Sequence, residues 1–374
     1  MPLLRVVYKS KQQHRIKKLC QNAAQRKFVV HPIQFYKKLL IFDGFFINLT
    51  YIILQIKTTM KVVLGIDIGG TRTKLGLVCN EGKIHKEKSF STKDHKNFDE
   101  YIDQLTLEVN TLLEKDEIYD VIGIGIGAPN ASSKRGTIEN AANLNWKGSL
   151  PIVESLEKYF NVPIKLMNDA SAAALGEKLF GGAKEMDDFI SVTLGTGFGG
   201  GIFCNGQLVD GFDGFAGELG HIDMTIGDGR LTGLNIKGGL EAYVSVTGLR
   251  RTVSHMLCYY MDDSPLRAIS YNDLTGEIIS DEARKGDFIA QQVFEYTAEI
   301  LGSALSNFVA FTQPEAIFMA GGLTKSSDLL LEPTKKYLEQ NLLEVYRGKV
   351  KLLISPLIDK NPAILGAAAL IWNE

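Results

Sequence analysis

One pattern occurs twice in this chain of 374 residues and constrains its fold more than any other feature. Residues 62–78 read VVLGIDIGGTRTKLGLV, and residues 188–203 read DFISVTLGTGFGGGIF. Each stretch consists of an apolar strand, a turn rich in glycine and threonine, and a returning strand. A strand–turn–strand unit that recurs within one chain predicts two related halves around a cleft.

Beyond residue 60 the sequence alternates strands with helices, which is typical of the α/β class. Apolar runs predict strands over residues 62–68, 74–79, 83–90, 121–126, 164–167, 189–194, 199–203, 316–319 and 350–354. Helical spacing predicts helices over residues 98–113, 151–160, 170–180, 239–257, 287–311, 328–341 and 362–372. With 45% apolar and 22% charged residues, the chain can bury a sizeable core, which excludes wholesale disorder.

The charge is distributed unevenly along the chain. Residues 1–59 hold eleven Lys or Arg and one acid, so that, of totals of 41 and 43, the remaining chain has 30 basic and 42 acidic residues. The chain beyond residue 59 is therefore net acidic. Because nucleic-acid phosphates require a basic face, we expect no nucleic-acid partner. The four cysteines are scattered and form no C-x-x-C pair. This favours a reducing compartment, the cytoplasm, over a disulfide framework.

Residues 1–59 end in a largely apolar segment, residues 39–56. A membrane span needs about 20 apolar residues, and Asp43 and Gly44 interrupt this shorter segment. A cleaved targeting peptide would show a small-residue cleavage site, and none stands here. Met60 directly precedes the first strand. We therefore expect residues 1–59 to be an extension outside the folded protein, with a membrane anchor as the alternative.

Three glycine turns, at residues 69–71, 195–197 and 320–322, each follow an apolar strand. Backbone N–H groups at such a corner can converge on a phosphate oxygen, although a single glycine turn is usually no more than a turn. None of the three has the P-loop pattern. The strand-end carboxylate of Asp67 is placed to hold Mg²⁺ through water. The residues expected to form this phosphate and Mg²⁺ site are Asp67, Gly69, Gly70, Thr71, Lys74, Gly195, Thr196, Gly197, Gly321 and Gly322.

A second group of carboxylate, amide and imidazole side chains has the chemistry that binds a polyol. Each member also has an ordinary explanation: a helix N-cap, a first-turn acid, a solvated loop residue or turn chemistry. A carboxylate near a hydroxyl can accept its proton as the transition state forms. Asp169, at a strand end, is the predicted general base. The whole group is Asn143, Asn168, Asp169, Glu218, His221 and Glu241.

These motifs stand in the order and spacing of the ROK family, which takes in bacterial glucokinases, other sugar kinases and sugar-responsive repressors. The chain resembles that family over about residues 61–372, in DIGGTRTK, ND, LGTG, ELGH and AGG. The resemblance implies two RNase H-like domains of the actin-like ATPase kind around a hinged cleft, and often a homodimer. We place one domain in residues 60–180 with 361–374, and the other in residues 181–360.

The resemblance also implies transfer of a phosphoryl group from ATP with Mg²⁺ to a hexose. By matched motif, Asp169 is the base, and Asn143, Asn168, Glu218, His221 and Glu241 hold the sugar. Glucose, converted to glucose 6-phosphate, is the leading substrate. N-acetylmannosamine, allose and fructose stay open, as do polyphosphate as the donor and a non-catalytic, sugar-responsive regulator.

One departure from the family concerns zinc. Many members carry three cysteines after the E-x-G-H motif, and these bind zinc together with the histidine. Aligned back from Glu241, the three positions are Thr232, Leu234 and Gly239. None of these is a plausible substitute ligand. We predict no structural zinc, and the sequence leaves open how the loop of residues 222–238 is then held.

Overall fold

The computed structural model describes residues 59–113, 118–225 and 227–373. The predictions for the basic stretch and for the apolar segment of residues 39–56 therefore lie outside the described residues. Within the described part of the chain, no helix combines the length and apolar character needed to cross a membrane.

The first half is built on a five-stranded sheet in the order β3-β2-β1-β4-β8. β1 pairs antiparallel with β2 and parallel with β4, and β4 pairs parallel with β8. The strands are β1 (Met60–Ile68), β2 (Arg72–Val78), β3 (Ile84–Ser91), β4 (Tyr119–Ala128) and β8 (Ile164–Asn168). Helices α4 (Phe98–Leu113) and α5 (Ile152–Glu157) add apolar side chains to the core of this half.

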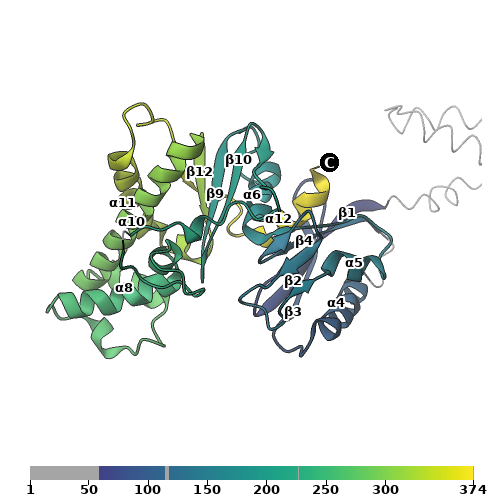
Figure 1. The fold of residues 1–374 in the computed structure, drawn as a ribbon, viewed down its shortest axis with the longest axis horizontal. Coiled ribbons are helices and arrows are strands. Elements are labelled where there is room, and N and C mark those ends of the chain that lie inside the picture. Colours follow the sequence, from purple (N-terminus) through teal and green to yellow (C-terminus); the bar gives the residue numbers. More distant parts are fainter. Residues whose placement is uncertain (1–58, 114–117, 226, 374) are drawn as a thin grey trace, which may run out of the picture. The chain divides into compact units, whose positions relative to one another are not determined.

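The second half repeats this topology in the order β11-β10-β9-β12-β13. β9 pairs antiparallel with β10 and parallel with β12, which in turn pairs parallel with β13. The strands are β9 (Phe189–Leu194), β10 (Phe198–Cys204), β11 (Gln207–Leu208), β12 (Ala316–Ala320) and β13 (Lys351–Ile354). The repeat predicted from the sequence is confirmed, and Figure 1 shows the two sheets.

Two helices connect the halves. Helix α6 (Asp169–Phe180) follows the last strand of the first sheet and packs against β9 and β10 of the second. Helix α12 (Pro362–Trp372) follows the last strand of the second sheet and packs against β1 and β4 of the first. The two helices also pack against each other, where a Cβ at Gly176 would lie 3.0 Å from the Cα of Gly366. Since these helices join both sheets, the predicted domain limits stay a prediction.

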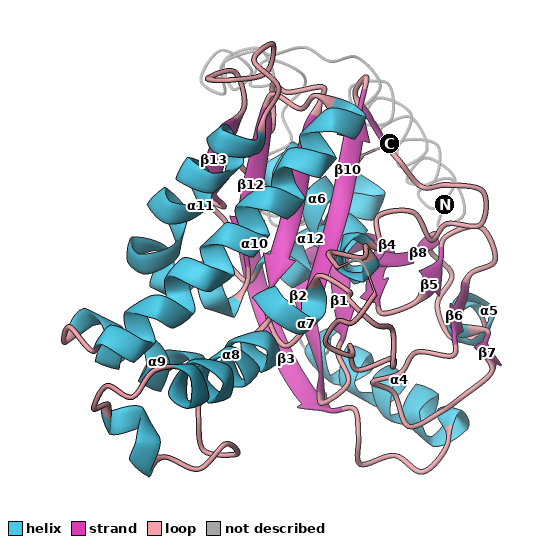
Figure 2. Cartoon of the chain, turned by 60° about the vertical axis from the view of Figure 1, so that its left-hand side comes forward, coloured by secondary structure: helices cyan, strands magenta, loops and turns pink. Residues whose placement is uncertain are grey.

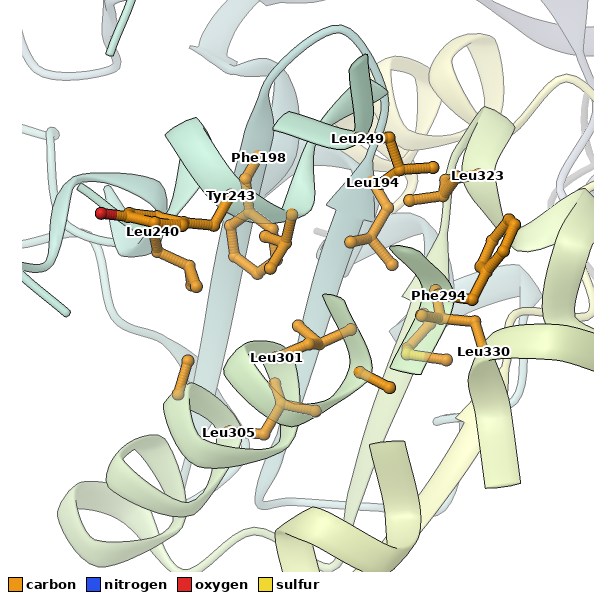
Figure 3. Packing of buried hydrophobic residues seen from close by; sticks show 14 of the residues in the cluster. Leu194, Phe198, Leu240, Tyr243, Leu249, Phe294, Leu301, Leu305, Leu323 and Leu330 are labelled. Atoms are coloured by element: carbon orange, nitrogen blue, oxygen red, sulfur yellow. The ribbon is translucent and has the colours of Figure 1, made fainter. Parts of the chain in front are cut away.

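The second half has the larger apolar core. Its helices are α7 (Glu241–Val244), α8 (Val246–Tyr259), α9 (Gly276–Arg284), α10 (Phe288–Thr312) and α11 (Ser327–Asn341). Figure 2 shows α10 and α11 along one face of the sheet. In Figure 3, Leu194 and Phe198, which flank the second glycine turn, lie among side chains from α7, α8 and α10. The turn therefore rests on a packed base. A small third sheet comprises β5 (Ala131–Ser132), β6 (Thr137–Glu139) and β7 (Ser149–Leu150).

The single helix predicted over residues 239–257 is wrong, because the structure has α7 and α8 with a break at Ser245. Ser245 is extended, and its side chain accepts the N–H of Gly248 as the N-cap of α8. The break also frees the N–H of Val246, which donates to the carbonyl of Gly195 at 3.0 Å. Apolar spacing hides such a cap, because the periodicity continues across it.

Candidate active site

The predicted base stands where the first sheet ends. β1, β4 and β8 are parallel, so their carboxyl ends share one edge. Asp67 lies near the end of β1, and Asn168 closes β8. Asp169 opens α6, and a Cβ on Gly127 of β4 would lie 3.7 Å from its Cα. The topology therefore gathers these side chains at one edge of the sheet.

Asp67 is a half-buried carboxylate, with 16% of its side chain exposed, and one cation lies near it. It is the cross-strand partner of Lys74, whose Nζ lies 3.7 Å from its Oδ2. Burial raises the pKa of Asp67 to about 6; Lys74 opposes this shift, and Asp169 adds to it. Mg²⁺ in phosphate-binding sites takes one or two carboxylates together with water and phosphate oxygens. This incompletely neutralised carboxylate fits that requirement.

The first glycine turn adjoins a predicted sugar residue. The N–H of Gly69 donates to the carbonyl of Arg72 at 3.1 Å, which closes the turn. A Cβ on Gly70 would lie 2.4 Å from the carbonyl oxygen of Asn143. Glycine is required there by close backbone approach. Thr71 is exposed.

The second turn leaves open space in front of it. The N–H of Gly195 donates to the carbonyl of Gly197 at 3.0 Å, so this N–H is used within the turn. A Cβ on Gly195 would meet no atom within 4 Å. Thr196 is exposed. The N–H groups of Thr196 and Gly197, rather than that of Gly195, are the candidate phosphate donors.

The third turn packs against the second. Gly321 has φ +95°, which favours glycine. A Cβ there would lie 2.5 Å from the carbonyl oxygen of Leu194, the residue before Gly195. Gly322 has open space around it. Two of the three predicted phosphate turns are thus neighbours, one at the end of β9 and one at the end of β12.

The Asn168–Asp169 pair has a capping function in the structure. The Oδ1 of Asn168 accepts the N–H groups of Ala170 at 3.0 Å and Ser171 at 3.3 Å. The Oδ1 of Asp169 accepts the Ala170 N–H at 2.8 Å. Protein surrounding Asp169 raises its pKa, and the backbone hydrogen bonds lower it in part. The residue still has a solvent-exposed surface, as a base that meets a substrate requires.

Glu218 and His221 face each other across a short 3₁₀ turn, Leu219–His221. The Nε2 of His221 lies 3.6 Å from Oε2 of Glu218. Burial raises the pKa of Glu218; His221 lowers it, while Asp169 and Glu241 raise it. The carboxylates predicted to handle the sugar are therefore close enough to influence one another.

Glu241 connects the sugar residues with the second turn. Its Oε2 accepts the N–H of Phe198 at 3.1 Å. A Cβ on Gly197 would lie 2.4 Å from the same oxygen. The sequence predicted sugar binding for Glu241, but this bond to the turn was missed, because it joins residues 43 positions apart.

A packing requirement beneath the base was not predicted from the sequence. A Cβ on Gly199 would lie 2.7 Å from the Cβ of Ala170. A Cβ on Gly201 would lie 2.5 Å from the Cβ of Ala174. These glycines of β10 let α6 approach the second sheet and so fix Asp169. The run of three glycines at positions 199–201 was the available signal.

The three positions that align with the family's zinc-binding cysteines do not supply metal ligands. The hydroxyl of Thr232 is buried and already accepts two backbone N–H groups, while Leu234 is an exposed apolar residue and Gly239 has no side chain. His221 has a buried Nδ1 with no hydrogen-bond partner among the described residues, which is a single potential ligand. In residues 59–113, 118–225 and 227–373, no three His, Cys, Asp or Glu side chains group to hold a metal.

Known proteins resemble this chain in sequence and in fold. A model of the ROK family matches residues 63–374. The glucokinase of Thermotoga maritima is 29% identical over 83% of this chain and 96% of its own. A ROK family glucokinase from Streptomyces griseus, solved with glucose and AMPPNP, is 32% identical with a TM-score of 0.70, over 83% and 98% of the two chains. The xylose repressor of Caldicellulosiruptor bescii is 26% identical over 86% and 81%.

The structural neighbours are ROK sugar kinases, and the fold is the actin-like ATPase fold that these kinases have. The predicted α/β class with two RNase H-like halves is confirmed, while the hinge between them stays a prediction. Since the family model covers almost all of the described residues, the chain belongs to the ROK family.

Proposed function

We propose that the protein transfers a phosphoryl group from ATP to a hexose, with glucose converted to glucose 6-phosphate as the leading reaction. The observation that carries the proposal is the placement of Asp169. It stands at the carboxyl edge of the first sheet, exposed to solvent, with surrounding protein raising its pKa. A base works best when its pKa lies near the working pH. The similarity to two glucokinases supports glucose.

In this proposal Asp169 accepts the proton of the attacking hydroxyl. Asn143, Asn168, Glu218, His221 and Glu241 orient the sugar. The glycine turns and Lys74 hold the phosphates of ATP, and Asp67 holds Mg²⁺ through water. Bound Mg²⁺ would neutralise charge on the phosphates. We also propose that the protein forms a homodimer. We further propose that it works in the cytoplasm, and the unpaired cysteines of the described residues support that location.

A sugar-responsive regulator is the second candidate, because a xylose repressor is similar over 86% of this chain. A regulator needs sugar binding but no base. A regulator would therefore bind sugar without turnover, whereas a kinase loses turnover when the base is removed.

The test is ADP release by the purified full chain with ATP and Mg²⁺. The panel contains glucose, N-acetylmannosamine, allose, fructose and xylose. With polyphosphate as a second donor, which yields no ADP, turnover is measured as formation of the sugar phosphate. The expected result is turnover on glucose well above the others, with a kcat about 10²–10⁴ lower in Asp169→Asn. Sugar binding by calorimetry without turnover on any sugar would favour the regulator.

A further inference from the structure

The loop of residues 222–240 joins two segments of the proposed sugar site. It begins directly after His221 and ends directly before Glu241. The N–H of Leu240 donates to the carbonyl of Ile222 at 3.0 Å, which closes the base of the loop. Any displacement of this base therefore moves residues on both sides of the proposed sugar site.

Thr232 organises the interior of the loop. It is 4% exposed, and its Oγ1 accepts the N–H groups of Leu234 and Ile236, both at 3.2 Å. Its own N–H donates to the carbonyl of Ile236 at 2.9 Å. Its methyl group lies 2.5 Å from where a Cβ on Gly239 would stand. Thr232 stands at one of the three positions that carry cysteine in many family members, and it contacts the residues at the other two, Leu234 and Gly239.

Arg230 fastens the loop to the helices behind it. Its Cζ lies 4.8 Å from the ring centre of Tyr243 in α7 and 5.5 Å from that of Tyr296 in α10. Its Nη1 donates to Oγ1 of Thr252 in α8 at 2.8 Å, and its backbone N–H donates to the Tyr243 hydroxyl at 3.0 Å. Planar guanidinium groups stack on aromatic rings in a way that lysine does not reproduce. A single residue therefore ties the loop to three helices.

We propose that Arg230 and Thr232 are positioning residues that hold this loop without metal and thereby keep His221 in place for the sugar. The inference rests on the proposed function. The Nε2 of His221 lies 3.6 Å from Glu218, and its buried Nδ1 has no hydrogen-bond partner in the described part of the chain. The ring is thus weakly fixed by its own contacts, and its place depends on the backbone that the loop base holds.

The test compares Arg230→Met and Thr232→Val with the control Lys237→Met in the purified full chain. Lys237 is a cation of the same loop whose ion pair with Asp228 is exposed, with an Nζ–Oδ1 distance of 3.4 Å. Loss of a hydrogen bond in a packed site changes an equilibrium by about tenfold. We therefore expect each positioning variant to raise the KM for the sugar by about tenfold and to leave the KM for ATP unchanged.

Thr232→Ser, which restores the hydroxyl, should recover most of the sugar KM, and Lys237→Met should behave as wild type. Equal changes in the KM for sugar and for ATP, or an unchanged sugar KM in both positioning variants, would overturn the proposal. So would wild-type protein that retains one zinc per chain after incubation with Zn²⁺ and desalting.

Hydrogen exchange separates this proposal from the proposed function, because it needs no turnover. Amides of residues 231–238 should exchange at least about tenfold faster in Arg230→Met than in Lys237→Met. If wild type turns over no sugar but this difference appears, the proposed function fails and the loop assignment stands. If exchange is the same in both variants, the loop assignment fails.

Discussion

The two strand–turn–strand units have the same strand pairing and different chemistry. At the second residue pair from the turn, the first unit places Asp67 opposite Lys74, and the second places Thr193 opposite Gly199. The first pair is charged and partly exposed at its lysine. The second is uncharged, and its glycine makes room for α6. A duplicated fold thus gives one strand pair suited to a cation and another that makes room for a helix.

The helices that follow the two sheets continue the comparison. α6 begins at Asp169, at the edge of the first sheet, and leads onto the second sheet, while α12 leads from the second sheet back to the first. The N-terminus of α6 lies in the proposed site, while Ser355, directly after β13 in the connection to α12, contacts the buried carboxylate of Glu177. The first connection is therefore expected to affect chemistry, and the second to affect stability.

The largest expected effect belongs to Asp169. Asp169→Asn keeps an oxygen that can accept the N–H of Ala170 but removes the proton acceptor. We expect kcat to fall by about 10²–10⁴, the usual contribution of a general base. Steady-state kinetics with the best hexose measure it, and thermal unfolding checks the fold. Turnover within a factor of two of wild type would remove Asp169 from the mechanism.

Much of this site was accessible to sequence reasoning, because it consists of strand ends. The repeat, the carboxylate at Asp67 and the pair at Asn168 and Asp169 all follow from apolar runs that stop at glycine or acid residues. Contacts between distant segments were not accessible. Glu241 bonds to the N–H of Phe198, and Arg230 stacks on Tyr296, and no local spacing encodes either contact.

The charged first unit should make stability depend on pH. Burial raises the folded-state pKa of Asp67 from 3.8 to about 6, so the folded chain holds this proton more tightly than the unfolded chain. The resulting stabilisation is complete below pH 3.8 and is lost as pH rises through 6. Relative to that of wild type, the free energy of unfolding of Asp67→Asn should rise by about 2–3 kcal/mol between pH 4 and pH 7.

Urea unfolding at a series of pH values measures this difference. Thr193→Val changes the equivalent position of the uncharged unit, and its difference from wild type should not vary with pH. If the two variants show the same pH dependence, the charge at Asp67 is not the cause, and the contrast between the units fails.

The same glycine substitution should act differently in the two turns. A Cβ on Gly70 would collide with the backbone of Asn143, whereas a Cβ on Gly195 would enter open space. Gly70→Ala should cost about 1–3 kcal/mol of folding stability by overpacking. Gly195→Ala should leave stability nearly unchanged and raise the KM for ATP by blocking phosphate approach. Gly195→Ala with wild-type ATP dependence would show that this turn is only structural.

The smallest expected effect tests the connection before α12. Ser355 is 1% exposed; its hydroxyl donates to Glu177 and accepts the N–H of Leu357 at 3.1 Å. Ser355→Ala should therefore lower the free energy of unfolding by about 1 kcal/mol, the net value of a hydrogen bond.

Ser149→Ala is the control, since its hydroxyl bonds to Glu139 at the surface, at 3.1 Å. Both changes remove a serine hydroxyl that donates to a glutamate, so urea unfolding compares buried with exposed contacts. Equal losses would mean that the connection before α12 adds no stability beyond that of a surface contact, and kcat should stay at the wild-type value in both variants.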